Sequence, residues 1–192
     1  MHEMKNLFIG TGGYVVQADS FKSALFVQSF KRIWTPDDKG NLDMNFNATI
    51  EIKTSREVKV CGMIGAGTSL KSNSASVSEN EIGVGGTSQW RLPALSSLTT
   101  LAFLLEVVNQ HNAPMPQGGK GIVQFVTRYT HSSGETRIRV TTLARSWADP
   151  QTGLEYIQVI FRKNKLKTRF FVLIFDFIGF YHAFTIFFGN SN

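Results

Sequence analysis

The sequence predicts a mainly β protein, in which an antiparallel β-sandwich follows a strand-helix remnant of an α/β domain and precedes an apolar C-terminal tail. Three observations support this prediction. Short apolar runs separated by polar turns fill the middle of the chain, hydrophobicity alternates with a period of two in the clearest of them, and no helical pattern lies between them. A chain of 192 residues with 42% hydrophobic residues is long enough to form the core of one such domain.

The first segment, residues 1–36, predicts a single α/β unit. Residues 7–16 are expected to form a short strand and turn, and Asp19 or Ser20 can cap a helix whose apolar residues recur at helical spacing over residues 21–34. One strand and one helix cannot bury both of their faces alone. This segment is therefore interpreted as the C-terminal remnant of a larger domain.

The β-sandwich is assigned to residues 40–147. Residues 42–53 (LDMNFNATIEIK) place apolar side chains at even positions and polar side chains at odd positions, which predicts a strand with one buried face. The serine-rich stretch at residues 67–86 is interpreted as a solvated connection. Five further strands are expected at residues 57–65, 87–92, 99–108, 121–129 and 136–144.

The net charge of +6 is concentrated near the C-terminus. Residues 162–169 (RKNKLKTR) hold five basic residues, so residues 1–161 carry 15 basic and 13 acidic groups and a net charge of only +2. A nucleic-acid-binding domain normally carries a basic footprint on the folded body, with aromatic residues placed to stack on bases. No nucleic-acid partner is therefore expected.

A single cysteine, Cys61, excludes a disulfide framework and also a cysteine-rich zinc site, which needs several thiolates at close spacing. The histidines, at positions 2, 111, 131 and 182, lack the short spacing that metal ligands use. No metal and no cofactor are therefore expected in this chain, and the cysteine content points to a reducing compartment such as the cytosol.

The loop at residues 109–121 (NQHNAPMPQGGKG) looks superficially like a phosphate-binding loop. A Walker loop needs Ser or Thr after GxxxxGK and leads into a helix, whereas Gly121 leads into an expected strand. His111 has neither a nucleophile motif nor an orienting partner in the sequence. No catalytic residue is assigned, and a phosphate-binding enzyme is the least favoured function.

Arginines recur on one predicted strand. Arg137 and Arg139 project to the same side, with Arg145 beyond them if the strand stays regular. Such a row can contact lipid phosphates or an acidic partner. An ordinary solvated face explains the row equally simply and is the favoured interpretation.

Four stretches together closely resemble the GTPase-activating subunit of the inner COPII coat, with a match that runs from about Glu3 to about Gln158. These stretches are residues 10–34, 47–70, 76–92 and 106–149. The resemblance implies that residues 1–36 end a trunk domain with a von Willebrand A-like α/β fold and that residues 40–147 form the family's β-sandwich. Residues 148–161 are then a linker.

The resemblance also implies partners and a location. In the family, the subunit pairs with the cargo-binding subunit of the inner coat and binds the coat-recruiting small GTPase on the cytoplasmic face of the endoplasmic reticulum membrane, on COPII-coated vesicles and in the cytosol. This implies a role in protein transport from endoplasmic reticulum to Golgi. A basic face of the family lies against the acidic membrane surface, and the candidates for it here are Arg128, Arg137, Arg139 and Arg145.

The resemblance does not extend to the family's catalytic or zinc-binding parts. The arginine that accelerates GTP hydrolysis lies in the helical and gelsolin-like part, C-terminal to the matched region, and the zinc finger needs four cysteines where this sequence offers only Cys61. We therefore expect a scaffold rather than an enzyme, and a fragment of a coat subunit.

Residues 162–192, basic and then apolar, are foreign to the family, and two explanations remain open. Residues 170–188 have the length of a membrane-spanning helix, which would make the chain a tail-anchored membrane protein with a β-sandwich binding module, although Asp176 would oppose insertion. Alternatively, the tail is translated non-coding sequence or the result of a frameshift, and the chain is a partial gene product. The second explanation is favoured because the apolar run shows no packing pattern and because the chain is also expected to start in the middle of a domain.

Overall fold

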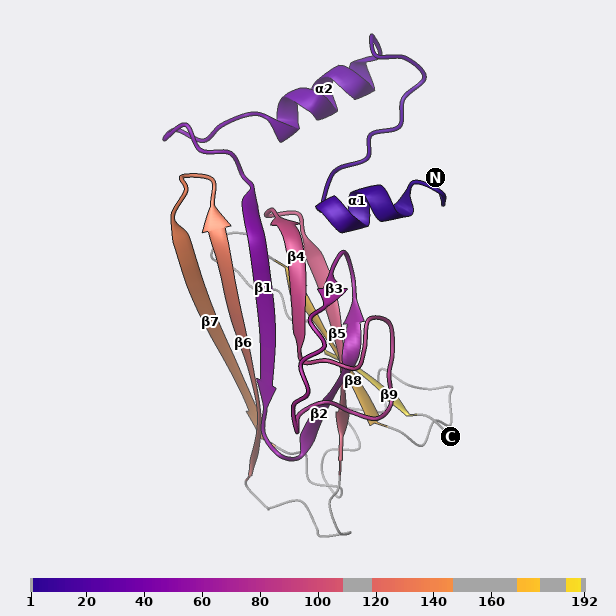
Figure 1. The fold of residues 1–192 in the computed structure, drawn as a ribbon, viewed down its shortest axis with the longest axis vertical. Helices are drawn as coiled ribbons and strands as arrows, with labels where there is room; N and C mark the ends of the chain where they lie inside the picture. Colours follow the sequence, from indigo (N-terminus) through magenta and orange to yellow (C-terminus); the bar gives the residue numbers. More distant parts are fainter. Residues whose placement is uncertain (1, 109–118, 147–168, 177–185, 191–192) are drawn as a thin grey trace.

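The computed structural model describes residues 2–108, 119–146, 169–176 and 186–190. Two antiparallel sheets form a β-sandwich, with two short helices at one end of it (Figure 1). The first sheet has the strand order β3-β4-β1-β6-β7, and the second has the order β2-β5-β8-β9. The mainly β, antiparallel fold expected from the sequence is confirmed.

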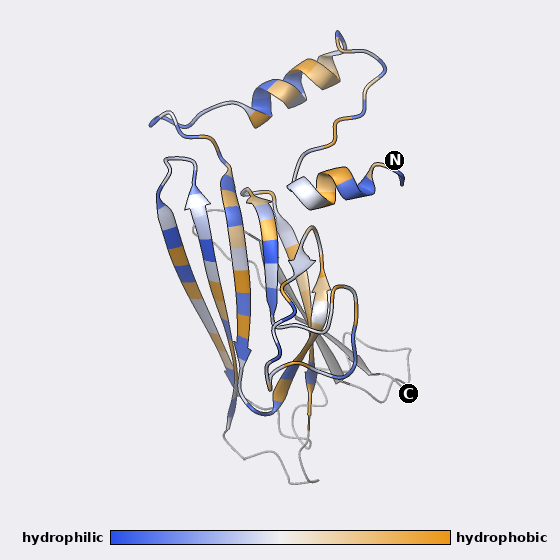
Figure 2. Ribbon diagram, in the orientation of Figure 1, coloured by the Kyte–Doolittle hydropathy of each residue, from blue (hydrophilic) through white to orange (hydrophobic). Residues whose placement is uncertain are grey.

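All six strands expected in the β-sandwich are present, and short or C-terminal strands add to them. The strands are β1 (Asn45–Thr54), β2 (Val58–Ile64), β3 (Thr68–Ser69), β4 (Gln89–Leu95), β5 (Thr100–Val107), β6 (Lys120–His131), β7 (Thr136–Ser146), β8 (Arg169–Asp176) and β9 (Ile186–Asn190). Figure 2 shows hydrophobic and hydrophilic residues alternating along β1 and β7, the pattern of strands with two different faces.

Strand β1 lies in the centre of the first sheet, between β4 and β6. Its even residues Ala48, Ile50 and Ile52 are fully buried, as the alternation predicts. Phe46 is 43% exposed, however, and the prediction that all even positions are buried is wrong there. The register against β6 shifts just after it, and Asn47 adopts a φ of 48°, so a bulge changes the face to which the preceding side chains point.

The core lies between the two sheets and is centred on three aromatic rings. Phe103 of β5 contacts Trp90 of β4 and Phe125 of β6, with ring centroids 5.4 and 5.5 Å apart. None of the three side chains is more than 1% exposed. Since burying a large apolar side chain contributes about 1.5–3 kcal/mol, these contacts fix the two sheets against each other.

The serine-rich stretch at residues 67–86 packs on β2, so its interpretation as a solvated connection is wrong in part. Ser78 N donates to Val60 O at 2.9 Å, and Val84 N donates to Met63 O at 2.8 Å. A Cβ at Gly62 would overlap the Ile82 carbonyl oxygen, so glycine permits this close approach. The stretch thereby covers the free side of β2 with backbone hydrogen bonds.

The segment expected to begin as a strand instead forms helix α1 (Lys5–Thr11). Among the described residues no strand pairs with it, so its backbone groups are satisfied locally within the helix. Gly12, with a φ of 65°, ends the helix, and Gly13 N donates to Phe8 O at 3.1 Å. The prediction of a strand over residues 7–16 is therefore wrong.

Helix α2 (Ala24–Ile33) confirms the expected helix but begins later than the predicted caps. Ser23, not Asp19 or Ser20, is the cap, since its Oγ accepts a hydrogen bond from Phe26 N at 3.2 Å. No residue of α2 is buried, and the helix lies apart from the strands (Figure 1). Its apolar residues therefore form an exposed surface.

The C-terminal tail contains strands where one interpretation required a single helix. β8 pairs antiparallel with β5, and β9 pairs with β8. A continuous helix over residues 170–188 is therefore wrong, because residues 169–176 and 186–190 have extended backbones in a sheet. In the described part of the chain, none of the helices has the length and apolar character needed to cross a membrane.

Candidate functional site

The four arginines predicted from the sequence lie on β6 and β7, the last two strands of the first sheet. Side chains of residues paired across an antiparallel ladder point to the same side of the sheet. Arg139 pairs with Thr127, which is 1% exposed and faces the core, whereas Arg128 pairs with Ile138, which is 66% exposed. Arg128 and Arg139 therefore point to opposite faces.

The same register places the other two arginines. Arg137 pairs with Tyr129, which packs against the core, and Arg145 has the same parity along β7. The structure thus brings together Arg137, Arg139 and Arg145, which we call the edge arginines because β7 is the last strand of its sheet. The prediction that these three share one side is confirmed, and the grouping of Arg128 with them is wrong.

Arg128 has other cations as neighbours on the outer face of the sheet. Arg91 of β4 and Arg128 of β6 both pair with Thr49 of the strand between them, so the two guanidinium groups flank one threonine. Lys53 and Lys120 point to the same side by parity. We call Lys53, Arg91, Lys120 and Arg128 the outer basic face.

The outer basic face has a net positive charge. On the outward-pointing side of β1, β4, β6 and β7 the single carboxylate is Glu51, so four cations and one anion give +3. Glu51 lies 3.8 Å from the Lys53 ammonium in an exposed pair. Exposed apolar side chains lie on the same face, namely Ile122, Ile138 and Val140. This combination suits an anionic surface that also presents apolar groups.

Shallow hollows surround Arg128. One of about 200 Å³ is lined by Thr49, Glu51, Arg128 and Ile138 among others, and a second of about 230 Å³ lies on the Asn47 side of the same arginine. Sites for small molecules usually measure about 300–1,000 Å³ and enclose their ligand. The outer basic face is therefore better suited to a broad surface than to a small substrate.

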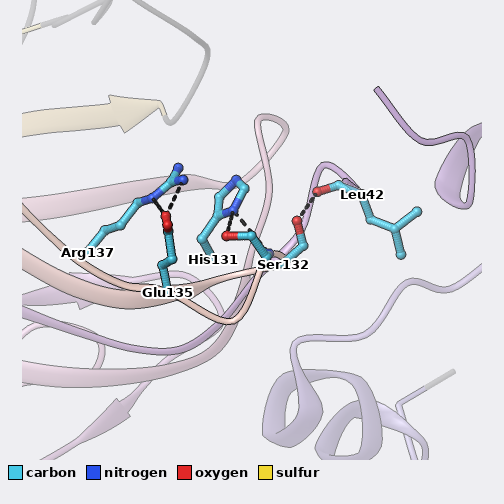
Figure 3. Close-up of polar contacts among 6 residues, drawn as sticks. Leu42, His131, Ser132, Glu135 and Arg137 are labelled. Atoms are coloured by element: carbon cyan, nitrogen blue, oxygen red, sulfur yellow. Dashed lines mark hydrogen bonds and ion pairs between the residues drawn. The ribbon is translucent and has the colours of Figure 1, made fainter. Parts of the chain in front are cut away.

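Arg137 is the one edge arginine with an acidic partner in the described residues. Its guanidinium donates to Glu135 Oε2 from Nη2 at 2.8 Å and from Nε at 3.3 Å (Figure 3). These hydrogen bonds and the positive charge lower the pKa of Glu135 from its ordinary value. Arg145 donates to the backbone oxygen of Ala144 at 3.0 Å. Within the described residues, Arg139 and Arg145 therefore have no carboxylate partner for their charge.

The turn between β6 and β7 orders Glu135 beside Arg137. Gly134, with a φ of 88°, allows a tight return, and Gly134 N donates to His131 O at 2.8 Å. Ser133 N donates to His131 Nδ1 at 3.2 Å, so that nitrogen is an acceptor (Figure 3). Ser132 Oγ donates to Leu42 O at 2.9 Å and ties the turn to the chain before β1.

The structure does not bring the remaining described sequence candidates together in one site. His111 lies outside the described residues. Lys120 and Gly121 belong to β6, which confirms that no helix follows the glycine-rich loop. Cys61 is fully buried, and burial together with the nearby charge of Glu106 raises the pKa of its thiol to about 11, so it is a poor nucleophile at neutral pH. Within the described ranges, no cluster of three or more His, Cys, Asp or Glu side chains could hold a metal ion.

One polar cluster was missed from the sequence. Glu106 of β5 is only 7% exposed, and its carboxylate accepts a hydrogen bond from Ser78 Oγ and one from Asn80 Nδ2, the latter at 2.9 Å. Both donors come from the serine-rich stretch. The alternation of β5 does not single out this carboxylate, because the four consecutive residues from Phe103 to Glu106 are all buried. The cluster anchors the stretch to the second sheet, which is a structural role.

A comparison with known protein families finds a match to the β-sandwich. A family model described as the Sec23/Sec24 beta-sandwich domain matches residues 45–148. The match covers 104 of 192 residues, counted inclusively from 45 to 148, and begins at the first residue of β1. It includes β7 and every residue of both basic surfaces described above.

Proposed function

The chain belongs to the Sec23/Sec24 family, and from this membership we propose that it is a COPII coat component that acts as a non-enzymatic scaffold in transport from endoplasmic reticulum to Golgi. The observation that carries the proposal is the family match over residues 45–148, because these residues include the strands from β1 to β7. A match of this length rests on a whole domain rather than on a short motif.

We propose further that the chain is of the GTPase-activating type and pairs with the cargo-binding subunit of the inner coat. The support is the close resemblance of residues 10–34 and 106–149 to that type of subunit. The trunk domain supplies much of the pairing surface in that type of subunit. The exposed apolar residues of α2, with Leu25 60% and Phe30 54% exposed, would be covered by such a neighbouring domain.

The acidic surface of the endoplasmic reticulum membrane is the third proposed partner, and the outer basic face is the part of the chain that we assign to it. Its charge of +3 and its exposed apolar side chains suit anionic lipid headgroups. The proposed place of action is accordingly the cytoplasmic face of that membrane and the vesicles formed from it.

A scaffold rather than a catalyst is proposed for two reasons. In the resembling subunits, the catalytic arginine belongs to a helical and gelsolin-like part that lies C-terminal to the region covered by the resemblance. In addition, the hollows in the described surface, of about 200 and 230 Å³, are shallow and hold no cluster of perturbed acids or bases.

Membrane recruitment tests the proposed function. The purified chain is mixed with vesicles, the coat-recruiting small GTPase in its GTP-bound or GDP-bound form, and the cargo-binding subunit, and the vesicles are then floated on a density gradient. At a salt concentration that prevents the chain alone from floating, we expect it to float only when both partners are present and the GTPase carries GTP. Flotation that is equal with GDP, or that does not need the cargo-binding subunit, would contradict a coat scaffold of the proposed type.

A further inference from the structure

Strand β7 is a long, open edge of the first sheet. Its 11 residues pair with β6 along the whole strand, from Thr136 to Ser146. No described strand pairs with its other side, so backbone donors and acceptors point away from the sheet there (Figure 1). Such an edge can accept a further strand.

Two of the other sheet edges are protected. β3, at the opposite edge of the same sheet, is only two residues long. β2, at the edge of the second sheet, is covered by residues 76–84 of the serine-rich stretch through backbone hydrogen bonds. Short strands and covering loops are ways in which proteins prevent unwanted strand pairing. β7 has neither device.

The side chains of β7 form two different rows. On the outer side are Ile138 and Val140, which are 66% and 55% exposed. On the core side are the edge arginines, at positions 137, 139 and 145. A strand added beside β7 would therefore meet β-branched apolar groups on one face and guanidinium groups on the other.

The row of arginines determines which strand fits. Opposite charges on neighbouring strands stabilise a pair and like charges destabilise it. Alternate side chains along a strand are about 6.8 Å apart, so carboxylates at every second position of an added strand match the spacing of Arg137 and Arg139. Arg139 has no side-chain hydrogen bond or ion pair within the described residues and is free to form one.

A second copy of β7 is a poor occupant of this edge. If two copies paired antiparallel about Thr141, Arg137 would lie opposite Arg145 of the second copy at both ends of the pair. An apolar strand fits no better, because the guanidinium groups of Arg139 and Arg145 would then have no carboxylate opposite them on the added strand. The same arginines thus oppose self-association and favour an acidic strand.

We propose that the free edge of β7 accepts an extended acidic segment of a partner protein by strand addition, with carboxylates at alternate positions beside the edge arginines. Backbone hydrogen bonds to β7 supply binding that does not depend on sequence, and the carboxylates supply the specificity. β-Branched residues on the other face of the segment pack against Ile138 and Val140.

The test uses the full chain and a fluorescent peptide of about eight residues in which glutamate alternates with valine and threonine. Fluorescence anisotropy measures the dissociation constant. Arg139→Glu is expected to raise it about tenfold, because it replaces an attraction by a repulsion in the pairing row. The matched control is Arg128→Glu, which makes the same charge change on the adjacent strand but on the outer face, and which should change the constant less than about twofold.

Two further probes separate strand addition from general attraction. A peptide with the same side chains and methyl groups on alternate backbone nitrogens cannot complete the ladder, and it should lose binding. Arg139→Lys keeps the charge and should bind within about threefold of the parent. If Arg139→Glu does not fold, as judged by circular dichroism, Arg145→Glu at the exposed end of the strand replaces it.

The proposal is overturned if Arg128→Glu weakens peptide binding as much as the edge variant does. It is overturned as well if the methylated peptide binds as tightly as the parent peptide, or if a peptide with lysine in place of glutamate does so. It is also overturned if phosphatidylserine vesicles lose binding in Arg139→Glu while the peptide does not, since the edge would then contact lipid. Recruitment by coat partners is measured separately, so failure of the peptide test leaves the coat function standing.

Discussion

Arg128 stands opposite Ile138 across the ladder between β6 and β7, and both side chains lie on the outer face of the sheet. The next residue of β7, Arg139, stands opposite the buried Thr127 and points the other way. Arg128 and Arg139 are thus close together on adjacent strands but belong to opposite faces of the sheet. This separation allows each surface to be changed without touching the other.

The outer basic face is expected to bind anionic vesicles. Each Lys or Arg near such a surface contributes about 1 kcal/mol, so the double variant Arg91→Gln, Arg128→Gln should lose about 2 kcal/mol, roughly thirtyfold in affinity. Sedimentation with phosphatidylserine vesicles at two salt concentrations measures the change. Arg137→Gln, Arg139→Gln is the control with the same loss of charge on the core side. Equal losses in the two double variants would mean that net charge, and not this face, determines binding.

Much of this arrangement could be predicted from the sequence, because side chains within a single strand alternate between the two faces of the sheet. The period of two correctly placed Ala48, Ile50 and Ile52 in the core, and it correctly put Arg137 and Arg139 on one side. The rule fails at Phe46, where one extra residue in a bulge reverses the side-chain direction.

The faces of different strands could not be related from the sequence, because the alternation within a strand carries no information on register between strands. The sequence therefore cannot show that Arg128 faces away from the edge arginines, or that Lys53, Arg91 and Lys120 are its neighbours. The apolar residues 7–16 also have no local signal that separates a strand from a short helix. α1 forms where no described strand pairs with the segment.

The buried carboxylate of Glu106 is expected to stabilise the fold by fixing the serine-rich stretch. Glu106→Ala leaves Ser78 and Asn80 without their acceptor and should lower the free energy of unfolding by about 1–3 kcal/mol. Urea denaturation measures this loss. Glu51→Ala, which removes the partially exposed carboxylate paired with Lys53, should cost only about 0–1 kcal/mol. An equal effect of both substitutions would exclude the anchoring role.

Cys61 is expected to make the stability fall at alkaline pH. The pKa of its thiol is raised from 9.0 to about 11 in the folded chain, mainly by burial. Between these values the unfolded chain loses the thiol proton and the folded chain keeps it, so unfolding becomes easier as the pH rises from about 9 to about 11, whereas below pH 9 the contribution is constant. The free energy of unfolding of the parent chain and of Cys61→Ala is measured by urea denaturation at pH 8, 9, 10 and 11. The difference between the two proteins isolates the contribution of the thiol, because the other groups that titrate at alkaline pH are common to both. A constant difference between the two proteins across the series would show that the thiol is not shielded.

The chain is expected not to accelerate GTP hydrolysis by the coat-recruiting small GTPase. An arginine finger must reach the transferring phosphoryl group, and it typically raises the rate by about 10³–10⁵. Most exposed arginines of the described sandwich lie on regular strands, where each side chain stands upright on a sheet surface. Arg56 is the exception and lies in the short turn between β1 and β2. Release of phosphate from the GTP-loaded GTPase, measured with and without the chain on vesicles, should differ by less than about twofold, far below that range. An increase of about tenfold or more would mean that an arginine of this chain acts in trans, and Arg139→Ala and Arg128→Ala would then show which surface carries it.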